Sequence, residues 1–192
     1  MITTLVSEPL APVQQEIGHP RHRHVVSAFS LEPSTFLQPV AIIVVPAVAS
    51  FSASDKYAYG TKNGVKIGFM SDEFIEGFQG KVEENVPAHA LRASRLRKMD
   101  QNQSALKEAG GEEANETFLA SVWDLLERHA AGLSTGLDLS GNDNIFQIRD
   151  VSGTIREVRL YSLGRQGWSI ATSRRPHLFA RSSGSCFFTR YF

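Results

Sequence analysis

The chain has 192 residues with 20 basic and 20 acidic side chains, and 42% of it is hydrophobic. This length suits one domain with its own core, and ordinary apolar content without net charge excludes wholesale disorder. The charge balance also excludes a uniformly basic nucleic-acid coat and a strongly acidic DNA mimic. The single cysteine, Cys186, excludes an internal disulfide framework and a cysteine-rich zinc module, and is predicted to be a small buried hydrophobe.

The order of local patterns predicts an arm followed by one domain. Residues 1–23 are predicted to form an extended N-terminal arm, because prolines recur there without an apolar period. Residues 24–192 are predicted to form a single α+β domain that begins with a strand at residues 24–30. Antiparallel strands and a β-hairpin come first, followed by two or three helices over about 71–132 and an antiparallel meander over about 144–192.

Residues 33–54 carry no charge and are the candidate for a membrane segment. Their apolar centre, residues 40–49, is half as long as the roughly 20 residues that a spanning helix needs. Because β-branched residues dominate residues 40–45, we predict a buried strand there that ends at Pro46. Acidic residues and prolines near the N-terminus argue against a secretory signal, so we expect a soluble, intracellular, cytoplasmic protein without a membrane partner.

The clearest local signal is the pair Asn63-Gly64. Both central residues of a type I′ turn need positive φ, and this pair is the favoured one. A two-residue loop then sets a register in which Lys62 faces Val65. We therefore predict a β-hairpin centred on this turn.

Two or three helices are predicted after the hairpin. Ser71 can cap a short helix over residues 71–80, whose first turn is acidic. A longer, basic helix is predicted over residues 87–110, because Pro87 suits a first helical turn and two glycines follow. Residues 115–132 show the strongest helical spacing of apolar residues.

The C-terminal region differs in charge from the rest of the chain. Residues 55–144 have a net charge of −5, whereas residues 145–192 contain eight arginines, no lysine and two acidic residues. Aromatic residues lie between these arginines, a combination that can grip phosphates and stack on bases, and that is also enriched in protein interfaces. The use of arginine without lysine favours an interface. The residues predicted to bind a partner are Arg149, Arg156, Arg159, Arg174, Arg175, Arg181, Arg190 and Tyr191.

A histidine cluster near the N-terminus is the candidate metal site. His19, His22 and His24 have spacings that suit zinc or nickel. Arg21 and Arg23 lie between them and would repel a divalent cation, so a solvated basic patch is the preferred interpretation. We expect no metal and no cofactor, and we name no catalytic residue.

The leading functional prediction is a non-enzymatic interaction protein. It would dock on a protein or nucleoprotein assembly through the arginine and aromatic residues of the C-terminal sheet. The uneven charge also suits head-to-tail self-association, and a viral or mobile-element origin fits so small a chain. The alternatives are a small metal-dependent enzyme that uses the histidine cluster and a direct binder of single-stranded nucleic acid.

Overall fold

A computed structural model of the chain describes residues 36–100, 103–172 and 181–191. The predicted arm at residues 1–23 and the strand expected at residues 24–30 lie outside the described residues. The described strands are β1 (Leu37–Val45), β2 (Val48–Ser52), β3 (Gly60–Lys62), β4 (Val65–Met70), β5 (Val82–Val86), β6 (His89–Leu96), β7 (Glu116–Thr117), β8 (Asn144–Arg149), β9 (Ile155–Ser162), β10 (Trp168–Thr172) and β11 (Cys186–Tyr191). The described helices are α1 (Ala53–Lys56), α2 (Asp72–Phe78), α3 (Ser104–Glu108) and α4 (Leu119–Ala130), with 3-10 turns η1 (Glu113–Asn115) and η2 (Gly164–Gln166).

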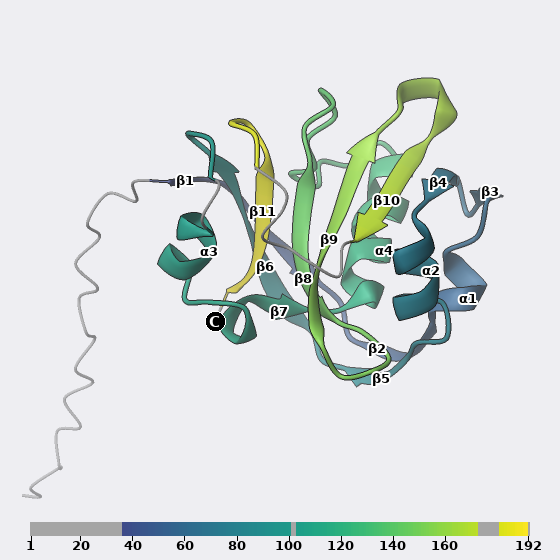
Figure 1. Cartoon of the computed structure of the whole chain (residues 1–192). Helices are drawn as coiled ribbons and strands as arrows, with labels where there is room; N and C mark the ends of the chain where they lie inside the picture. Colours follow the sequence, from purple (N-terminus) through teal and green to yellow (C-terminus); the bar gives the residue numbers. More distant parts are fainter. Residues whose placement is uncertain (1–35, 101–102, 173–180, 192) are drawn as a thin grey trace, which may run out of the picture. The chain divides into compact units, whose positions relative to one another are not determined.

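Nine of these strands form one mixed sheet, in the order β1-β6-β11-β8-β9-β10-β4-β3, with β7 also paired to β8 (Figure 1). The predicted fold, α+β with helices in the middle and a C-terminal antiparallel meander, is wrong, because the structure is mostly β with a different topology. β8, β9 and β10 are antiparallel neighbours as expected. However, β11 lies between β6 and β8 and runs parallel to β8, and β10 runs parallel to β4.

The side chains of β11 explain why it is a central strand. Phe187 and Phe188 are consecutive and therefore point to opposite faces of the sheet. Each is only 1% exposed. A strand with apolar side chains on both faces needs a covering layer on each side, which an inner position provides and the end of a meander does not.

The helix predicted over residues 87–110 is also wrong. Residues His89–Leu96 form β6, which pairs with β1 on one side and β11 on the other, and only Ser104–Glu108 are helical in this region. The segment contains good helix formers, but its thin apolar stripe gives a helix little to bury. As a strand, β6 pairs its backbone groups on both sides, and this tertiary pairing overrides the local propensity.

Two prolines divide a long antiparallel ribbon into two parts. β1 pairs with β6 up to Val45 and His89, and β2 pairs with β5 from Val48 and Val86 onward. The intervening residues include Pro46 on one strand and Pro87 on the other. Proline has no backbone N–H to donate, so the ladder is interrupted at this level. The strand predicted over residues 40–45 is present and ends before Pro46, but the prediction that it is buried is wrong, because Val40, Ile42 and Val44 are exposed.

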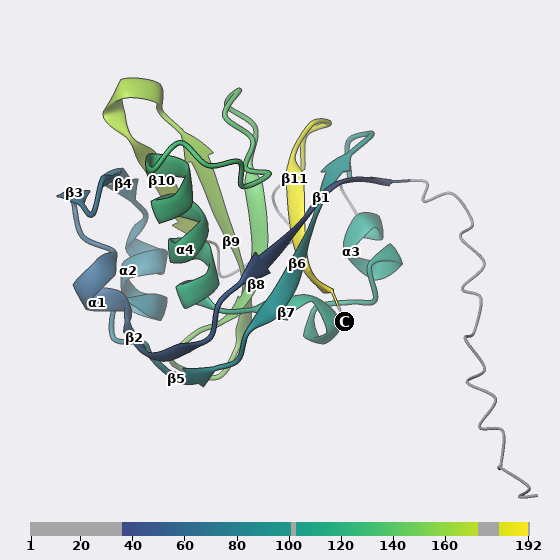
Figure 2. The same cartoon turned by 180° about the vertical axis from the view of Figure 1, so that it is seen from behind.

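One face of the sheet, here called the α4 face, carries the main core. α1, α2 and α4 pack on it, and Figure 2 shows α4 in front of the strands. Tyr57 follows α1 and lies 5.3 Å from Trp123 of α4 and 5.5 Å from Phe74 of α2, measured between ring centroids. The hydroxyl of Tyr57 donates to the carbonyl of Leu119 at 3.0 Å. The core therefore joins all three helices.

Several local predictions are confirmed. β3 and β4 form the hairpin with Lys62 opposite Val65, and Asn63 has the positive φ that the turn needs. Ser71 caps α2 by accepting a hydrogen bond from the Phe74 amide. The helix expected over residues 115–132 is α4, Leu119–Ala130.

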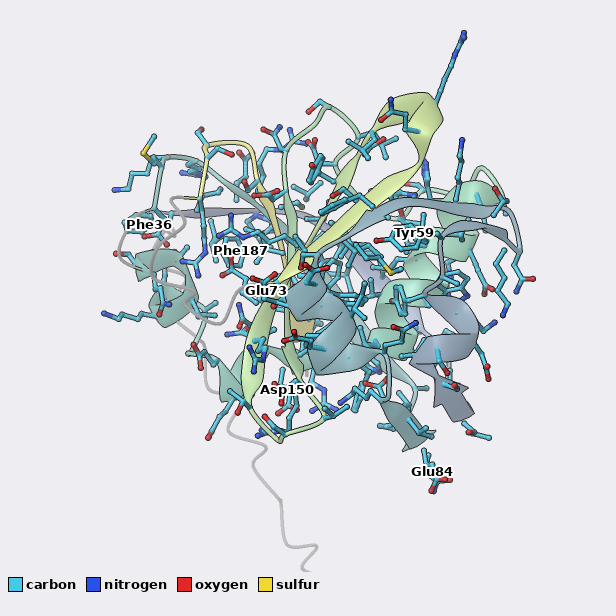
Figure 3. All side chains as sticks on the ribbon, turned by 45° about the vertical axis from the view of Figure 1, so that its right-hand side comes forward. Phe36, Tyr59, Glu73, Glu84, Asp150 and Phe187 are labelled. Carbon is cyan, nitrogen blue, oxygen red and sulfur yellow. The ribbon has the colours of Figure 1, made fainter. Side chains whose placement is uncertain are left out.

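The opposite face, here called the α3 face, carries a smaller core. α3 packs there through Ala105, which contacts a cluster that includes Leu96, Ile145 and Phe187. Asp100 accepts hydrogen bonds from the backbone amides of Ser104 at 2.9 Å and Ala105 at 3.0 Å, which fixes the start of α3. Figure 3 shows the labelled Phe187 in the interior.

Candidate interaction surface

The arginines predicted to bind a partner do not share one face of the sheet. Side chains alternate along a strand, so Arg156 and Arg159 on β9 point to opposite faces. On β11, Arg190 lies on the α4 face with its guanidinium 5.1 Å from the ring centroid of Phe118, and Tyr191 lies on the α3 face. The predicted residues that lie outside the described part of the chain are Arg174, Arg175, His19, His22 and His24.

Near the end of the β8–β9 hairpin, Arg149 and Arg156 each form an ion pair with a carboxylate. Arg149 donates to both carboxylate oxygens of Glu116, at 3.0 and 2.7 Å, and to the carbonyl of Gly153 at 2.7 Å. Arg156 donates to the carboxylate of Asp150. Both guanidinium groups therefore stabilise the hairpin itself.

Arg159 and Arg181 belong to a buried ionic network around Glu157. Arg181 is 1% exposed, and it donates to Glu157 at 2.9 Å and to Asp100 at 3.4 Å. Arg159 donates to the other oxygen of Glu157 at 2.7 Å and to Asp143 at 3.2 Å. Burial raises the pKa of Asp143 above its ordinary value. The guanidinium of Arg181 neutralises carboxylates inside the protein and is not at the surface.

The edge strand β1 presents a different kind of surface. It is nine residues long, contains no charged side chain, and among the described residues pairs with β6 alone. Val40, Ile42 and Val44 are 48%, 57% and 66% exposed. Ile42 and Val44 lie at alternate positions and form an apolar stripe on the α3 face of β1, and Val40 is the extra residue of a β-bulge between Pro39 and Ala41. Native proteins usually protect an edge of this length with a charge, a bulge or a covering element.

Packing on the other side of β1 fixes which residues are exposed. Ile43 belongs to the main core, and Ala41 faces Gly136 on the α4 face. Gly136 has a φ of +69°, and a Cβ built there would lie 3.1 Å from Ala93 Cβ and 3.5 Å from Ala41 Cβ. A larger residue would therefore displace this loop from the strand. The loop thus covers the α4 side of β1, whereas Ile42 and Val44 on the α3 side are exposed.

Arg92 and Tyr191 extend the stripe across the sheet. Arg92 on β6 lies opposite Ile42 on β1. Its guanidinium lies 4.4 Å from the ring centroid of Tyr191 on β11, and Tyr191 is 41% exposed. We call the five residues Val40, Ile42, Val44, Arg92 and Tyr191 the β1 surface.

The other edge of the large sheet is built differently. β3 has only three residues, Gly60–Lys62, all exposed. A short edge strand with a lysine is a usual protection against pairing with another chain. The two described edges of this sheet thus differ: β1 is longer and uncharged, and it has a bulge and Pro39 in its first half, whereas residues 41–45 form a regular ladder without a charge.

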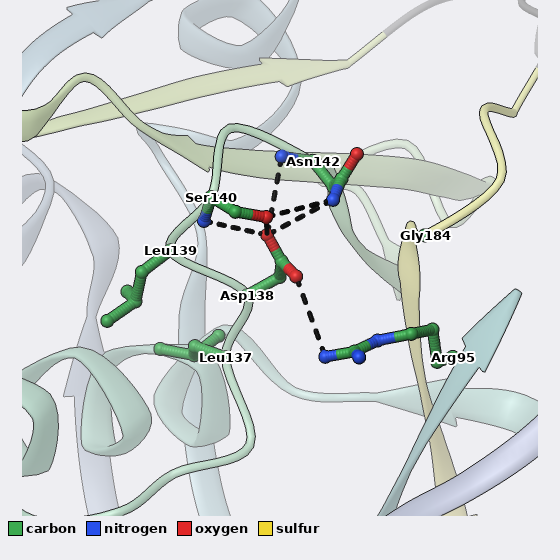
Figure 4. Close-up of a pocket in the computed structure, with 7 residues that line it drawn as sticks. All are labelled: Arg95, Leu137, Asp138, Leu139, Ser140, Asn142 and Gly184. Atoms are coloured by element: carbon green, nitrogen blue, oxygen red, sulfur yellow. Dashed lines mark hydrogen bonds and ion pairs between the residues drawn. The ribbon is translucent and has the colours of Figure 1, made fainter.

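A hollow of about 460 Å³ lies at the end of β6, on the α4 face. Figure 4 shows that Asp138 closes its loop, accepting hydrogen bonds from Ser140 and Asn142 and facing Arg95 at 3.7 Å. Burial disfavours the charged form of Asp138, but the hydrogen bonds from Ser140 and Asn142 outweigh it, and the pKa of Asp138 is lowered. Nearby, burial raises the pKa of Cys186 to about 11, so the thiol is protonated at neutral pH. These groups stabilise the loop, and neither is an activated nucleophile.

No protein-family model, curated protein or solved structure matches this chain. Of the helices in the described residues, none is long and apolar enough to span a membrane. Within the same residues, no group of three or more His, Cys, Asp or Glu side chains is placed to bind a metal ion.

Sequence reasoning identified the strand at residues 40–45 but did not predict that one of its faces is exposed. The run Ile42–Val45 is apolar at every position, a pattern typical of a strand buried on both faces. Arg92 was placed on a helix, which hid its position next to this strand. The absence of charge over residues 33–54 was the one sequence feature that pointed to this surface. It does not show which face of the strand lacks a covering element.

Proposed function

We propose that this protein is a non-enzymatic interaction protein that binds another polypeptide by strand addition at β1. The observation that carries the proposal is the charge-free edge strand with three exposed β-branched side chains, of which Ile42 and Val44 lie on one face of its regular part, after the bulge at Val40. The partner is an extended segment that pairs with the backbone of β1 and covers Val40, Ile42 and Val44.

Strand addition at this edge gains two kinds of interaction. Alternate backbone N–H and C=O groups of an edge strand point away from its sheet and can pair with an added strand. Covering half-exposed Val and Ile side chains contributes on the order of 1 kcal/mol each, since full burial of such a side chain contributes about 1.5–3 kcal/mol. The backbone pairing supplies register, and the apolar stripe supplies affinity.

Arg92 and Tyr191 give the surface a polar end. Arginine and tyrosine are enriched where protein interfaces are strongest, because each combines a large apolar area with hydrogen-bonding groups. The stacked arrangement, 4.4 Å from guanidinium carbon to ring centroid, holds both side chains in one orientation. Tyr191 thus keeps the partner-binding role expected from the sequence, whereas the guanidinium groups of Arg149 and Arg181 are engaged by carboxylates of this chain.

Site-specific photo-crosslinking tests this proposal. p-Benzoylphenylalanine replaces Val44 in the whole chain, and a matched variant carries it at Val82, an apolar residue of β5 that is 59% exposed. Both variants are irradiated in the cells that make the protein. We expect defined polypeptide adducts from position 44 and none from position 82. Equal labelling at both positions, or none at position 44, contradicts binding through β1.

A further inference from the structure

We infer that the partner bound at β1 is a short extended peptide segment, antiparallel to β1, whose aromatic, small and β-branched residues lie opposite Val44, Ile43 and Ile42. The inference rests on the proposed strand addition and names the class of its partner. The length of the segment follows from the backbone of β1, and its side chains follow from the two faces of that strand.

The hydrogen bonds at the end of β6 show which of its residues bond to β1. The amide of Leu96 donates to the carbonyl of Ser185, which precedes β11, at 2.7 Å. The amide of Arg97 donates to the carbonyl of Phe36, which precedes β1, at 2.8 Å. Because the bonding direction alternates along a strand, the odd-numbered residues of β6 bond toward β1 and the even-numbered residues bond toward β11.

The register then shows which backbone groups of β1 face outward. After the bulge, the odd-numbered residues of β1 lie opposite odd-numbered residues of β6. The N–H and C=O groups of Ile42 and Val44 therefore point away from the sheet. Pro39 before them and Pro46 after them have no N–H to donate. An added strand can thus pair fully only between the two prolines, which limits the bound segment to a few residues.

So short a ladder suits a flexible peptide better than a second folded domain. Folded proteins that associate stably bury roughly 1,200–2,000 Å² of total surface, far more than a few paired residues provide. A flexible segment also loses conformational freedom when it is ordered on β1. We therefore expect a dissociation constant on the order of 100 µM. The antiparallel direction is favoured because parallel pairing is slightly less stable per residue.

The α3 face determines the two outer side chains of the segment. In an antiparallel pair, the residues that bond to Ile42 and Val44 place their side chains beside them on this face. Beyond Val44 lies Ala90, followed by Tyr191, which is 41% exposed. An aromatic side chain opposite Val44 can cover this low, apolar surface. A β-branched residue opposite Ile42 forms a favoured cross-strand pair.

The α4 face determines the middle residue of the segment. The side chain of that residue lies beside Ile43, on the side where the loop of Gly136 packs against β1. A Cβ built at Gly136 would lie 3.5 Å from Ala41 Cβ and 3.5 Å from Ile43 Cδ1, so the loop lies directly on the strand. We therefore expect a small middle residue. Read from its N-terminus, the bound segment is aromatic, small and β-branched.

Fluorescence anisotropy of a labelled peptide with the purified whole chain tests the inference. The probe is fluorescein-Thr-Phe-Ala-Val-Thr-amide, whose Phe would lie opposite Val44 and whose Val would lie opposite Ile42. N-methylation of the Phe and Val amides removes the two donors that face β1, and we expect at least tenfold weaker binding. N-methylation of the Ala amide, which faces away from β1, is the matched control and should change the dissociation constant by less than about twofold.

A proline in β1 gives the converse test on the protein. Val44→Pro removes an outward-facing N–H but no hydrogen bond to β6, so we expect a folded chain by circular dichroism and at least tenfold weaker peptide binding. Val44→Thr keeps both the N–H and the β-branched shape, and should weaken binding by less than about threefold. Equal binding by the two variants would contradict pairing through the backbone.

Amide hydrogen exchange of the isotopically labelled whole chain, followed by NMR, tests the geometry without a variant. In the free chain the amides of Ile42 and Val44 should exchange fast, and those of Ile43 and Val45 slowly. The peptide should slow exchange at Ile42 and Val44. Protection of these two amides in the free chain would mean that the edge is already occupied, by a second copy or by another part of the chain, and would overturn the inference.

The outcomes separate this inference from the proposed function. Binding of the probe that is weakened by N-methylation at Phe and Val, and not at Ala, supports both. If the probe does not bind, or if all N-methylated peptides bind equally, the short antiparallel segment is wrong. If the Val44 photo-probe then still captures a polypeptide, and Ile42→Pro abolishes that adduct, strand addition at β1 stands with a different class of partner. If the peptide does not bind and position 44 captures nothing, both are wrong.

Discussion

At the scale of single residues, the arginines of the C-terminal region are mainly structural. Four members of the predicted set are each in an ion pair with a carboxylate of the same chain: Arg149, Arg156, Arg159 and Arg181. Buried charges are tolerated when they are paired and hydrogen-bonded. The preference for arginine over lysine therefore reflects the bidentate geometry of guanidinium within the protein as well as any role at an interface.

Arg181→Leu tests this structural role. The substitution leaves Glu157 and Asp100 buried without their counter-ion, and breaking a buried pair costs about 3–5 kcal/mol of stability. Arg149→Leu is the matched control, because the Arg149 side chain is 42% exposed and its loss should matter far less. Urea unfolding at neutral pH measures both. Equal stability of the Arg181→Leu variant and the wild type would show that the network does not hold the fold.

Asp150 predicts a pH dependence of stability. Its carboxylate accepts hydrogen bonds from Ser152 at 2.8 and 2.6 Å and from the Thr154 amide at 2.9 Å, and it pairs with Arg156. Burial disfavours the charged form, but these donors outweigh it and lower the pKa of Asp150 to about 2. A folded pKa below the unfolded value of about 3.9 stabilises the fold above pH 4, and this contribution is lost as the pH falls from about 4 to 2.

The measurement is the difference in unfolding free energy between wild type and Asp150→Asn. We expect wild type to be more stable by about 1–2 kcal/mol at pH 7, with the difference shrinking between pH 4 and pH 2. A difference that stays constant over this range would contradict the assignment of the stabilisation to the charged carboxylate.

At the scale of elements, α4 depends on a residue far away in the sequence. Phe118 stands at its N-cap and offers no side-chain hydrogen bond. The buried carboxylate of Glu83 on β5 instead accepts from the amides of Leu119 at 3.0 Å and Ala120 at 2.9 Å. A negative charge at a helix N-terminus is also favoured by the helix dipole. This contact ties the small β2–β5 sheet to the main core.

Glu83→Ala should therefore destabilise the protein by about 2 kcal/mol, since it removes the cap and leaves buried amides unsatisfied. Glu84→Ala is the control on the neighbouring residue, whose side chain is exposed in the middle of β5 (Figure 3), and it should change stability by less than about 0.5 kcal/mol. Thermal and urea unfolding report both. Equal effects at the two positions would mean that Glu83 does not cap α4.

At the scale of the whole molecule, the last strand completes a sheet begun by the first. β11 closes the gap between β6 and β8, so the N-terminal ribbon and the C-terminal hairpin become one sheet only when residues near the C-terminus are in place. Among the described strands, this arrangement leaves β1 at an edge of the sheet.

Local chemistry in the sequence determined the elements whose signals lie within a few residues: the turn at Asn63-Gly64, the cap at Ser71, the amphipathic helix α4 and the strand that ends at Pro46. Tertiary structure decided the rest. Residues 89–96 became a strand because two neighbouring strands satisfy its backbone, and Arg181 became a buried ion because Glu157 and Asp100 meet it from distant segments. Tertiary structure likewise decided which side of β1 is buried: Gly136 and its loop pack on one side of a strand that is apolar on both. Such outcomes depend on which distant segments meet, and periodicity along one segment carries no information about its neighbours.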